Sequence, residues 1–151
     1  MKCIRPLTAS LLFSSAMLLA MTACTTPAAP AAGGSALPLE GTNWRLASLG
    51  GQAVPTPAGV REVYLVLDGA QRRASGFAGC NQFFAGYTLS GTSLRFERPG
   101  ATLMACPAMA QEQSYLNALA TIWSGRMAGE RLQLLDAQGK SQAEFTARAA
   151  R

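Results

Sequence analysis

The chain has 151 residues, with 13 Lys and Arg against 8 Asp and Glu, which gives a formal net charge of +5. The basic residues are scattered, with Arg72 next to Arg73 as the only adjacent pair, so the charge does not favour a nucleic-acid-binding face. The sequence contains no histidine, which removes the usual general base, the common zinc ligand and every Ser–His or Cys–His nucleophile pair. The composition therefore predicts a protein that is not an enzyme and that holds no metal or other cofactor.

The first 24 residues have the features of a bacterial export signal. Lys2 and Arg5 precede an apolar stretch at residues 11–19, which is too short to span a bilayer of about 30 Å as a helix. The letters M-T-A-C at residues 21–24 then resemble a lipobox, the motif in which signal peptidase II cuts before a diacylated cysteine. We therefore expect a lipoprotein signal peptide at residues 1–23.

Cleavage at this site would leave Cys24 as the lipidated first residue. Acyl chains contribute about 0.8 kcal/mol per buried methylene, so two or three chains anchor a protein stably in a membrane. Thr25, rather than aspartate, follows Cys24, and in lipoprotein sorting of enteric-type bacteria this implies the outer membrane, with the protein facing the periplasm. The alternative is an ordinary signal peptide cut near Ala23, which would release a soluble protein.

Residues 24–36 are rich in Pro, Ala and Gly after the cysteine. Such a segment cannot bury enough apolar surface to offset the entropy of ordering, so we expect a flexible tether. The globular domain is expected at residues 37–151.

The globular part shows short runs of alternating apolar and polar residues between turn signals, which is typical of antiparallel strands. A helix is expected at residues 108–123, since Pro107 suits its start and Gly125 its stop. Strands are expected at residues 42–49, 62–67, 72–77, 87–89, 93–96, 101–105, 126–128, 131–135 and 140–146. This pattern predicts an α+β fold, mainly antiparallel β: a small rolled sheet or partly open barrel of about eight strands with one helix.

The most unusual stretch is residues 75–87, S-G-F-A-G-C-N-Q-F-F-A-G-Y, where glycines lie between aromatic residues. With Cys3 removed in the signal and Cys24 acylated, Cys80 and Cys106 remain as one pair in an oxidising compartment, where a structural disulfide is the default. A redox-active pair and a metal site are the alternatives, although two thiolates without histidine make a poor zinc site.

Four side chains near the centre of this stretch are candidates for contact with a ligand. Asn81 follows Gly79 closely, and an asparagine in that position more often bonds backbone groups in a turn. Phe83, Phe84 and Tyr87 are candidate ligand-facing residues of a lipid or aromatic pocket, yet aromatic residues beside glycines are usually core.

Several segments, in the right order, resemble the META/HslJ-like domain family: G-T-N-W-R-L, the glycine–aromatic stretch, T-L-M-A-C-P and L-Q-L-L-D-A-Q-G-K. The resemblance covers residues 39–146. It implies a small α+β fold dominated by antiparallel strands, an envelope lipoprotein associated with heat or antibiotic stress, and no established catalytic residues. The family has also been likened to cracked-barrel pilot lipoproteins that bind lipid-like tails. The matching motif residues, expected to be structural, are Gly79, Cys80, Asn81, Met104, Cys106 and Pro107.

Two binding functions and one enzymatic function compete. The first hypothesis is a non-catalytic, stress-associated lipoprotein of the outer membrane that binds a hydrophobic ligand or another envelope protein. The alternative is a periplasmic lipoprotein inhibitor of a hydrolase such as lysozyme, although Lys140, the only lysine after the signal, lacks the loop context of such inhibitors. An enzyme built on Glu97 and Glu112 as paired carboxylates has no spacing to support it.

Overall fold

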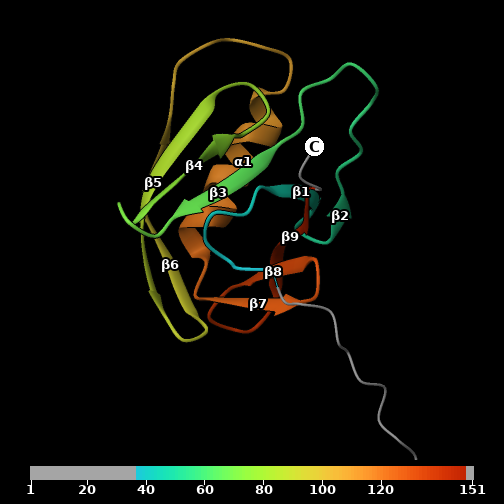
Figure 1. The fold of residues 1–151 in the computed structure, drawn as a ribbon. Helices are drawn as coiled ribbons and strands as arrows, with labels where there is room; N and C mark the ends of the chain where they lie inside the picture. The colour runs from blue at the N-terminus through green and yellow to red at the C-terminus, as the bar shows by residue number, and fades with distance from the viewer. Residues whose placement is uncertain (1–36, 149–151) are drawn as a thin grey trace, which may run out of the picture. The chain divides into compact units, whose positions relative to one another are not determined.

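The computed structural model describes residues 37–148. The expected signal peptide, the lipidated Cys24 and the tether at residues 24–36 lie outside the described residues. Among the described residues, no helix is both long and apolar enough to cross a membrane. Figure 1 shows the arrangement of the elements, which are β1 (Trp44–Leu49), β2 (Gln52–Ala53), β3 (Tyr64–Asp68), β4 (Arg73–Phe77), β5 (Gln82–Ser90), β6 (Ser93–Ala101), α1 (Met109–Thr121), β7 (Ser124–Ala128), β8 (Arg131–Leu135) and β9 (Ser141–Ala147).

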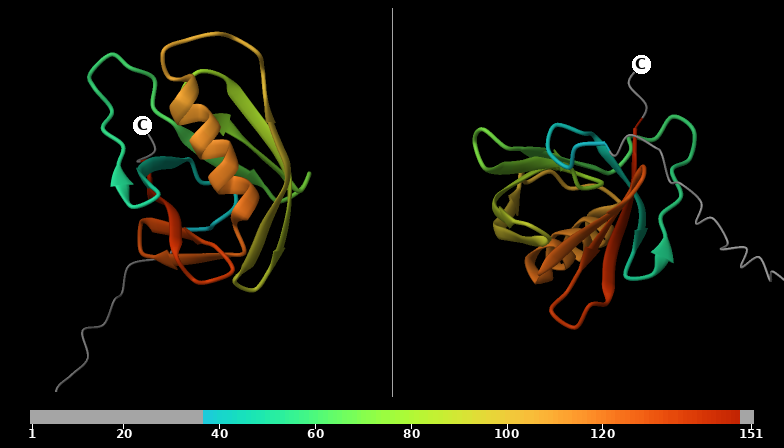
Figure 2. Two further views of the ribbon diagram at one scale, coloured as in Figure 1. Left: turned by 180° about the vertical axis from the view of Figure 1, so that it is seen from behind. Right: turned by 60° about the horizontal axis from the view of Figure 1, so that its bottom comes forward.

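The nine strands form one antiparallel sheet that curls into a ring, as both views in Figure 2 show. β1 closes the ring, because it pairs with β9 along one edge and with β3 at the start of its other edge. Two of the strand pairings in the ring are short: β6 and β7 share the single residue pair Ser93 with Ser124, and β1 and β3 share two residue pairs. The expected fold class is confirmed, with nine strands rather than about eight, and the ring is not a clean barrel.

The interior of the ring is filled by aromatic and aliphatic side chains. Trp44, Phe83, Tyr115 and Phe145 are among the largest that are fully buried. The rings of Phe83 and Phe145 lie edge-on to the Tyr115 ring, with centroids 5.4 and 6.3 Å away, a geometry that aromatic pairs prefer. The buried side chains of residues 37–148 form one core cluster.

Helix α1 packs against β6, β9 and β1. Glu112, Tyr115 and Leu119 are its buried residues, at positions i, i+3 and i+7, which places them on one face of a helix. Tyr115 is an α1 residue in the core, so its packing fixes the position of the helix. The first helical turn, which carries Glu112, is thereby fixed as well.

The helix ends earlier than the sequence predicts. We expected it to run to Trp123 and to stop at Gly125, but it ends at Thr121 and Gly125 lies inside β7. The backbone of Trp123 instead joins the sheet, because its N–H donates to the Leu135 carbonyl at 2.8 Å and its carbonyl accepts from β6. Pairing with the sheet therefore replaces the last helical turn.

The prediction of a strand at residues 101–105 is wrong, because only residue 101 is in a strand, at the end of β6. The Thr102 N–H still donates to the Gln82 carbonyl at 3.0 Å. The next available N–H, that of Met104, donates to the side chain of Asn81 at 2.8 Å instead of to a strand. A side chain thus takes the place of a strand partner, and the segment becomes a loop.

The glycine–aromatic stretch is more regular than expected. We expected a short strand at residues 87–89, whereas β5 is nine residues long and begins at Gln82. Gly86 lies within it, and the pairing with β6 shifts between Phe84 and Gly86, which is the signature of a β-bulge. β2 was not expected at all, since a strand of two residues leaves no periodicity to detect.

Candidate functional site

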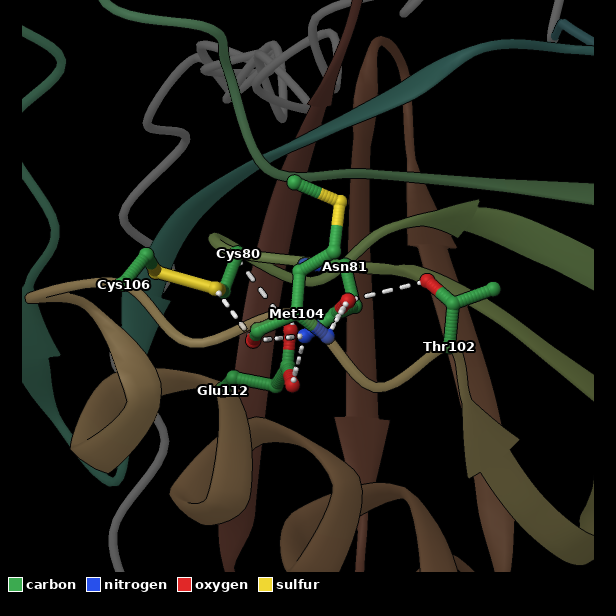
Figure 3. Close-up of a disulfide and its surroundings, with 6 residues drawn as sticks. All are labelled: Cys80, Asn81, Thr102, Met104, Cys106 and Glu112. Atoms are coloured by element: carbon green, nitrogen blue, oxygen red, sulfur yellow. Dashed lines mark hydrogen bonds between the residues drawn. A yellow bond between two sulfur atoms is a disulfide. The ribbon is translucent and has the colours of Figure 1, made fainter.

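A disulfide joins Cys80, between β4 and β5, to Cys106, in the loop before α1 (Figure 3). The Cα atoms are 5.9 Å apart, and the two cysteines are 26 residues apart in the chain. The structure thus contains the disulfide that the cysteine count predicts. It fixes one end of residues 102–108, which we call the clasped loop.

Asn81 fixes the middle of the clasped loop, although its side chain was expected to bond within a local turn. Its Oδ1 accepts from the Met104 N–H at 2.8 Å and from the Thr102 hydroxyl at 2.9 Å. Its Nδ2 donates to the Met104 carbonyl at 3.0 Å. The carboxamide therefore pairs with both backbone groups of Met104, as a neighbouring strand would, and it does so while only 2% exposed.

Glu112 connects this arrangement to the helix. Its Oε2 accepts from the Asn81 N–H at 2.6 Å and from the Cys80 N–H at 3.3 Å, and its Oε1 accepts from the Asn81 Nδ2 at 2.9 Å (Figure 3). The side chain is buried, with 7% exposed. A carboxylate that receives three N–H donors can be buried without a cation, because hydrogen bonds replace its hydration. Glu97 lies exposed on β6, so the two carboxylates play different structural parts.

Sequence analysis missed the role of Glu112, although a signal was present. An acidic residue three positions before Tyr115 and seven before Leu119 lies on the buried face of the helix. A buried carboxylate requires hydrogen-bond donors, and a pattern of buried positions does not say which groups supply them. Asn81 lies 31 residues before Glu112 in the sequence, and only the three-dimensional structure brings the two together.

Gly79 and Pro107 shape the two backbones that the disulfide joins. Gly79 has φ +119°, a conformation that side chains rarely allow, whereas a Cβ there would meet its neighbours at ordinary distances of 3.5 Å or more. The requirement for glycine is therefore conformational. Pro107 lies in the turn between Cys106 and α1, where the Met109 N–H donates to the Cys106 carbonyl at 3.3 Å.

The three aromatic candidates do not come together on one surface. Phe83 points inward against Tyr115. Phe84 faces the outside of the sheet and is 47% exposed, and its ring lies over Gly100, where a Cβ would meet it at 3.4 Å. It covers the bare backbone of the neighbouring strand. Tyr87 is buried, with its hydroxyl donating to Glu40.

Neither of the buried tyrosine hydroxyls is activated. Burial, together with the hydrogen bond to the Glu40 carboxylate, raises the pKa of Tyr87 to about 12. Burial alone raises the pKa of Tyr115 far above its ordinary value. Both groups keep their protons near neutral pH, so Tyr87 acts as a donor that ties Glu40, near the start of the described domain, to β5.

The clasped loop exposes apolar side chains in spite of being firmly held. Leu103 is fully exposed and Met104 is 66% exposed, and Met109, at the first position of α1, is half-exposed. Single exposed apolar residues are common, but a group of long ones on a held loop is typical of an interaction site. Within residues 37–148, no group of three or more His, Cys, Asp or Glu gathers that could hold a metal ion.

Comparison with known proteins gives a family and two solved structures. The chain matches the META domain family over residues 37–149. It is 34% identical to a protein from Burkholderia xenovorans whose structure was solved by NMR, with a TM-score of 0.58 over 74% of this chain and 85% of that one. A second NMR structure, at 18% identity, has a TM-score of 0.56 over 72% of this chain and 90% of that one, which is a likeness of fold. No curated protein matches the chain.

Proposed function

This chain belongs to the META domain family, and we propose that it is an outer-membrane lipoprotein with a non-catalytic role in heat or antibiotic stress. In this proposal, Cys24 is diacylated and holds the domain at the membrane, facing the periplasm. The clasped loop binds a hydrophobic ligand or another envelope protein. The lipobox-like residues 21–24 and the family resemblance support the location and the stress association.

The observation that carries the binding role is the exposure of Leu103 between two residues that Asn81 holds in place. Exposing an apolar side chain of this size forgoes about 1.5–3 kcal/mol of burial free energy. The loop around it is fixed by the disulfide and by the Asn81 hydrogen bonds. A loop that is ordered before binding loses little entropy on binding, so its exposed side chains are suited to be contact points.

The chemistry near the loop supports binding rather than catalysis. The Glu112 carboxylate is occupied by N–H donors from Cys80 and Asn81. A general base must be free to take a proton from a substrate, and this carboxylate is committed to the fold. The raised pKa values of Tyr87 and Tyr115 argue against either hydroxyl as a nucleophile.

Crosslinking in intact cells tests the proposal. The exported protein is crosslinked and recovered from membranes, beside a variant with Leu103→Ser and Met104→Ser and a control with Val60→Ser, an exposed apolar residue on another loop. We expect the double variant to lose its crosslinked partner about tenfold, as the loss of two contact residues implies, and the control to keep it. Equal crosslinking by all three proteins would contradict a role for the clasped loop.

Two further experiments test the membrane anchoring and the alternative function as a lysozyme inhibitor. A Cys24→Ala variant cannot be diacylated and should therefore leave the outer-membrane fraction, and a wild-type protein that is already soluble would refute the anchoring. Stoichiometric inhibition of lysozyme by the exported protein would favour the inhibitor hypothesis instead.

A further inference from the structure

A second surface, separate from the clasped loop, lies between α1 and the β1–β2 hairpin. It is an open groove of about 690 Å³, within the usual size range of ligand sites. Leu49 and Val54 line it from the hairpin, and the exposed side of α1 lines it from the other side. Figure 2 shows the hairpin and the helix on the same side of the molecule.

Three of the six α1 residues that line this groove are small. Ala110, Ser114 and Ala118 follow one another at i, i+4 and i+8, so they form one stripe on the helix. The Ser114 hydroxyl donates to the Ala110 carbonyl at 2.9 Å, and the Thr121 hydroxyl donates to the Ala118 carbonyl at 2.8 Å. Because both hydroxyls are turned back onto the helix, the stripe presents mainly carbon, and a backbone can approach it closely.

Four carboxamide side chains also line the groove. Gln52, Gln111, Asn117 and Gln142 all line the groove. Asn117 accepts from Gln113 through Oδ1, and Gln142 donates to Asp136 through Nε2, so these bonds leave the NH₂ group of Asn117 and the side-chain oxygen of Gln142 unused. A carboxamide offers a donor and an acceptor side by side, which is the pattern of the peptide group itself.

The composition of the groove narrows the chemistry of its ligand. None of its eleven lining residues is charged or aromatic. Three smaller hollows on the described surface each include an arginine: Arg61 in one, Arg73 in another and Arg126 in the third. An anionic ligand would meet a cation in those hollows but none in the groove. A nucleobase would have no aromatic ring to stack on in the groove. An acyl chain would lie in an open groove next to four carboxamides.

We infer that this groove binds an uncharged segment of another protein, in extended conformation and with small side chains. A stretch rich in Ala, Gly, Ser and Pro can bring its main chain close to Gly50, Ala110 and Ala118. Its peptide groups then meet the carboxamides, while its methyl groups pack against Leu49 and Val54. A charged side chain in the segment would lose hydration without gaining a partner.

The test uses the exported protein, labelled with ¹⁵N, and a synthetic decapeptide of Ala, Gly, Ser and Pro with blocked ends. We expect the peptide to shift the amide resonances of Gly50, Ala110, Ser114 and Ala118. The same peptide with two Lys residues, or with two Asp residues, should bind about tenfold more weakly. No shift with the neutral peptide up to about 1 mM, or equal binding of all three peptides, would overturn the inference.

Matched substitutions on α1 locate the site. Ala118→Arg fills the groove, whereas Ala120→Arg adds the same side chain to an exposed position two residues away that does not line it. We expect at least about tenfold weaker peptide binding for the first variant and unchanged binding for the second, with both retaining the dispersed spectrum of a folded protein. Equal effects of the two variants, or preferential binding of a neutral detergent chain over the peptide at the same resonances, would contradict the proposed ligand class.

Discussion

Two loops of this domain expose apolar side chains, and they are held in different ways. The loop between β2 and β3 exposes Val60 at 57%, and the backbone bond within its middle is local, from the Val60 N–H to the Pro57 carbonyl. Side chains hold only its far end, where Glu62 forms ion pairs at 3.5 Å with Arg45 and Arg148. Such exposed pairs contribute little to stability.

The clasped loop is held by groups that are distant in the sequence. The disulfide spans 26 residues, the bonds from Asn81 to Met104 span 23, and those from Asn81 to Glu112 span 31. Fixing through distant parts of the chain ties the loop to the global fold, whereas a local bond can open without unfolding the rest. Of the exposed apolar residues on these two loops, only those on the clasped loop are therefore held in a fixed geometry.

Of the changes that should loosen the clasped loop, removing the disulfide is expected to have the largest effect. Replacing Cys80 and Cys106 by Ser frees a closed loop of about 26 residues, which should lower the free energy of unfolding by about 3.5 kcal/mol on the chain-entropy model. Urea unfolding of the purified wild type and double variant measures it. A loss below about 1 kcal/mol would show that the hydrogen bonds of Asn81 hold the clasped loop without the disulfide.

Asn81→Ala should have the next largest effect. It removes the bonds to both backbone groups of Met104 and one of the donors to Glu112, and we expect a loss of about 2–3 kcal/mol in the free energy of unfolding. Thr88→Ala, on the exposed face of β5, is the control and should change stability by less than about 0.5 kcal/mol. If the two variants were equally stable, the contribution of Asn81 to the clasped loop would be refuted.

Much of the fold was predictable because its signals are local. The alternation of apolar residues in β3, β4, β8 and β9, with turns between them, was sufficient to predict these strands and the mainly antiparallel class. The errors came where distant groups override local preference. The end of α1 moved because the backbone of Trp123 pairs with Leu135, and the strand expected at residues 101–105 was lost because Asn81 took the place of a strand partner.

Cys80, Asn81 and Cys106 were predicted as residues of the site, whereas the structural role of Glu112 and the exposure of Leu103 were not. The cysteine count identified Cys80 with Cys106, since few pairings were available. The helical spacing of Glu112 to Tyr115 and Leu119 indicates that Glu112 is buried. The partners of Asn81 and Glu112 depend instead on how three distant segments meet, and no spacing in the sequence encodes that. Phe84 points outward because β5 alternates between buried and exposed residues, but the predicted strand began only at residue 87, so the sequence did not place Phe84 in a strand.

Backbone ¹⁵N relaxation of the exported protein tests whether the clasped loop is more rigid than the loop between β2 and β3. For residues 102–108, where Asn81 bonds Thr102 and Met104 and the disulfide holds Cys106, we predict order parameters of about 0.85, equal to those of the strands. For residues 55–60 we predict values below about 0.6. Order parameters for the clasped loop as low as those of the other loop would contradict the claim that Leu103 and Met104 are presented in a fixed geometry.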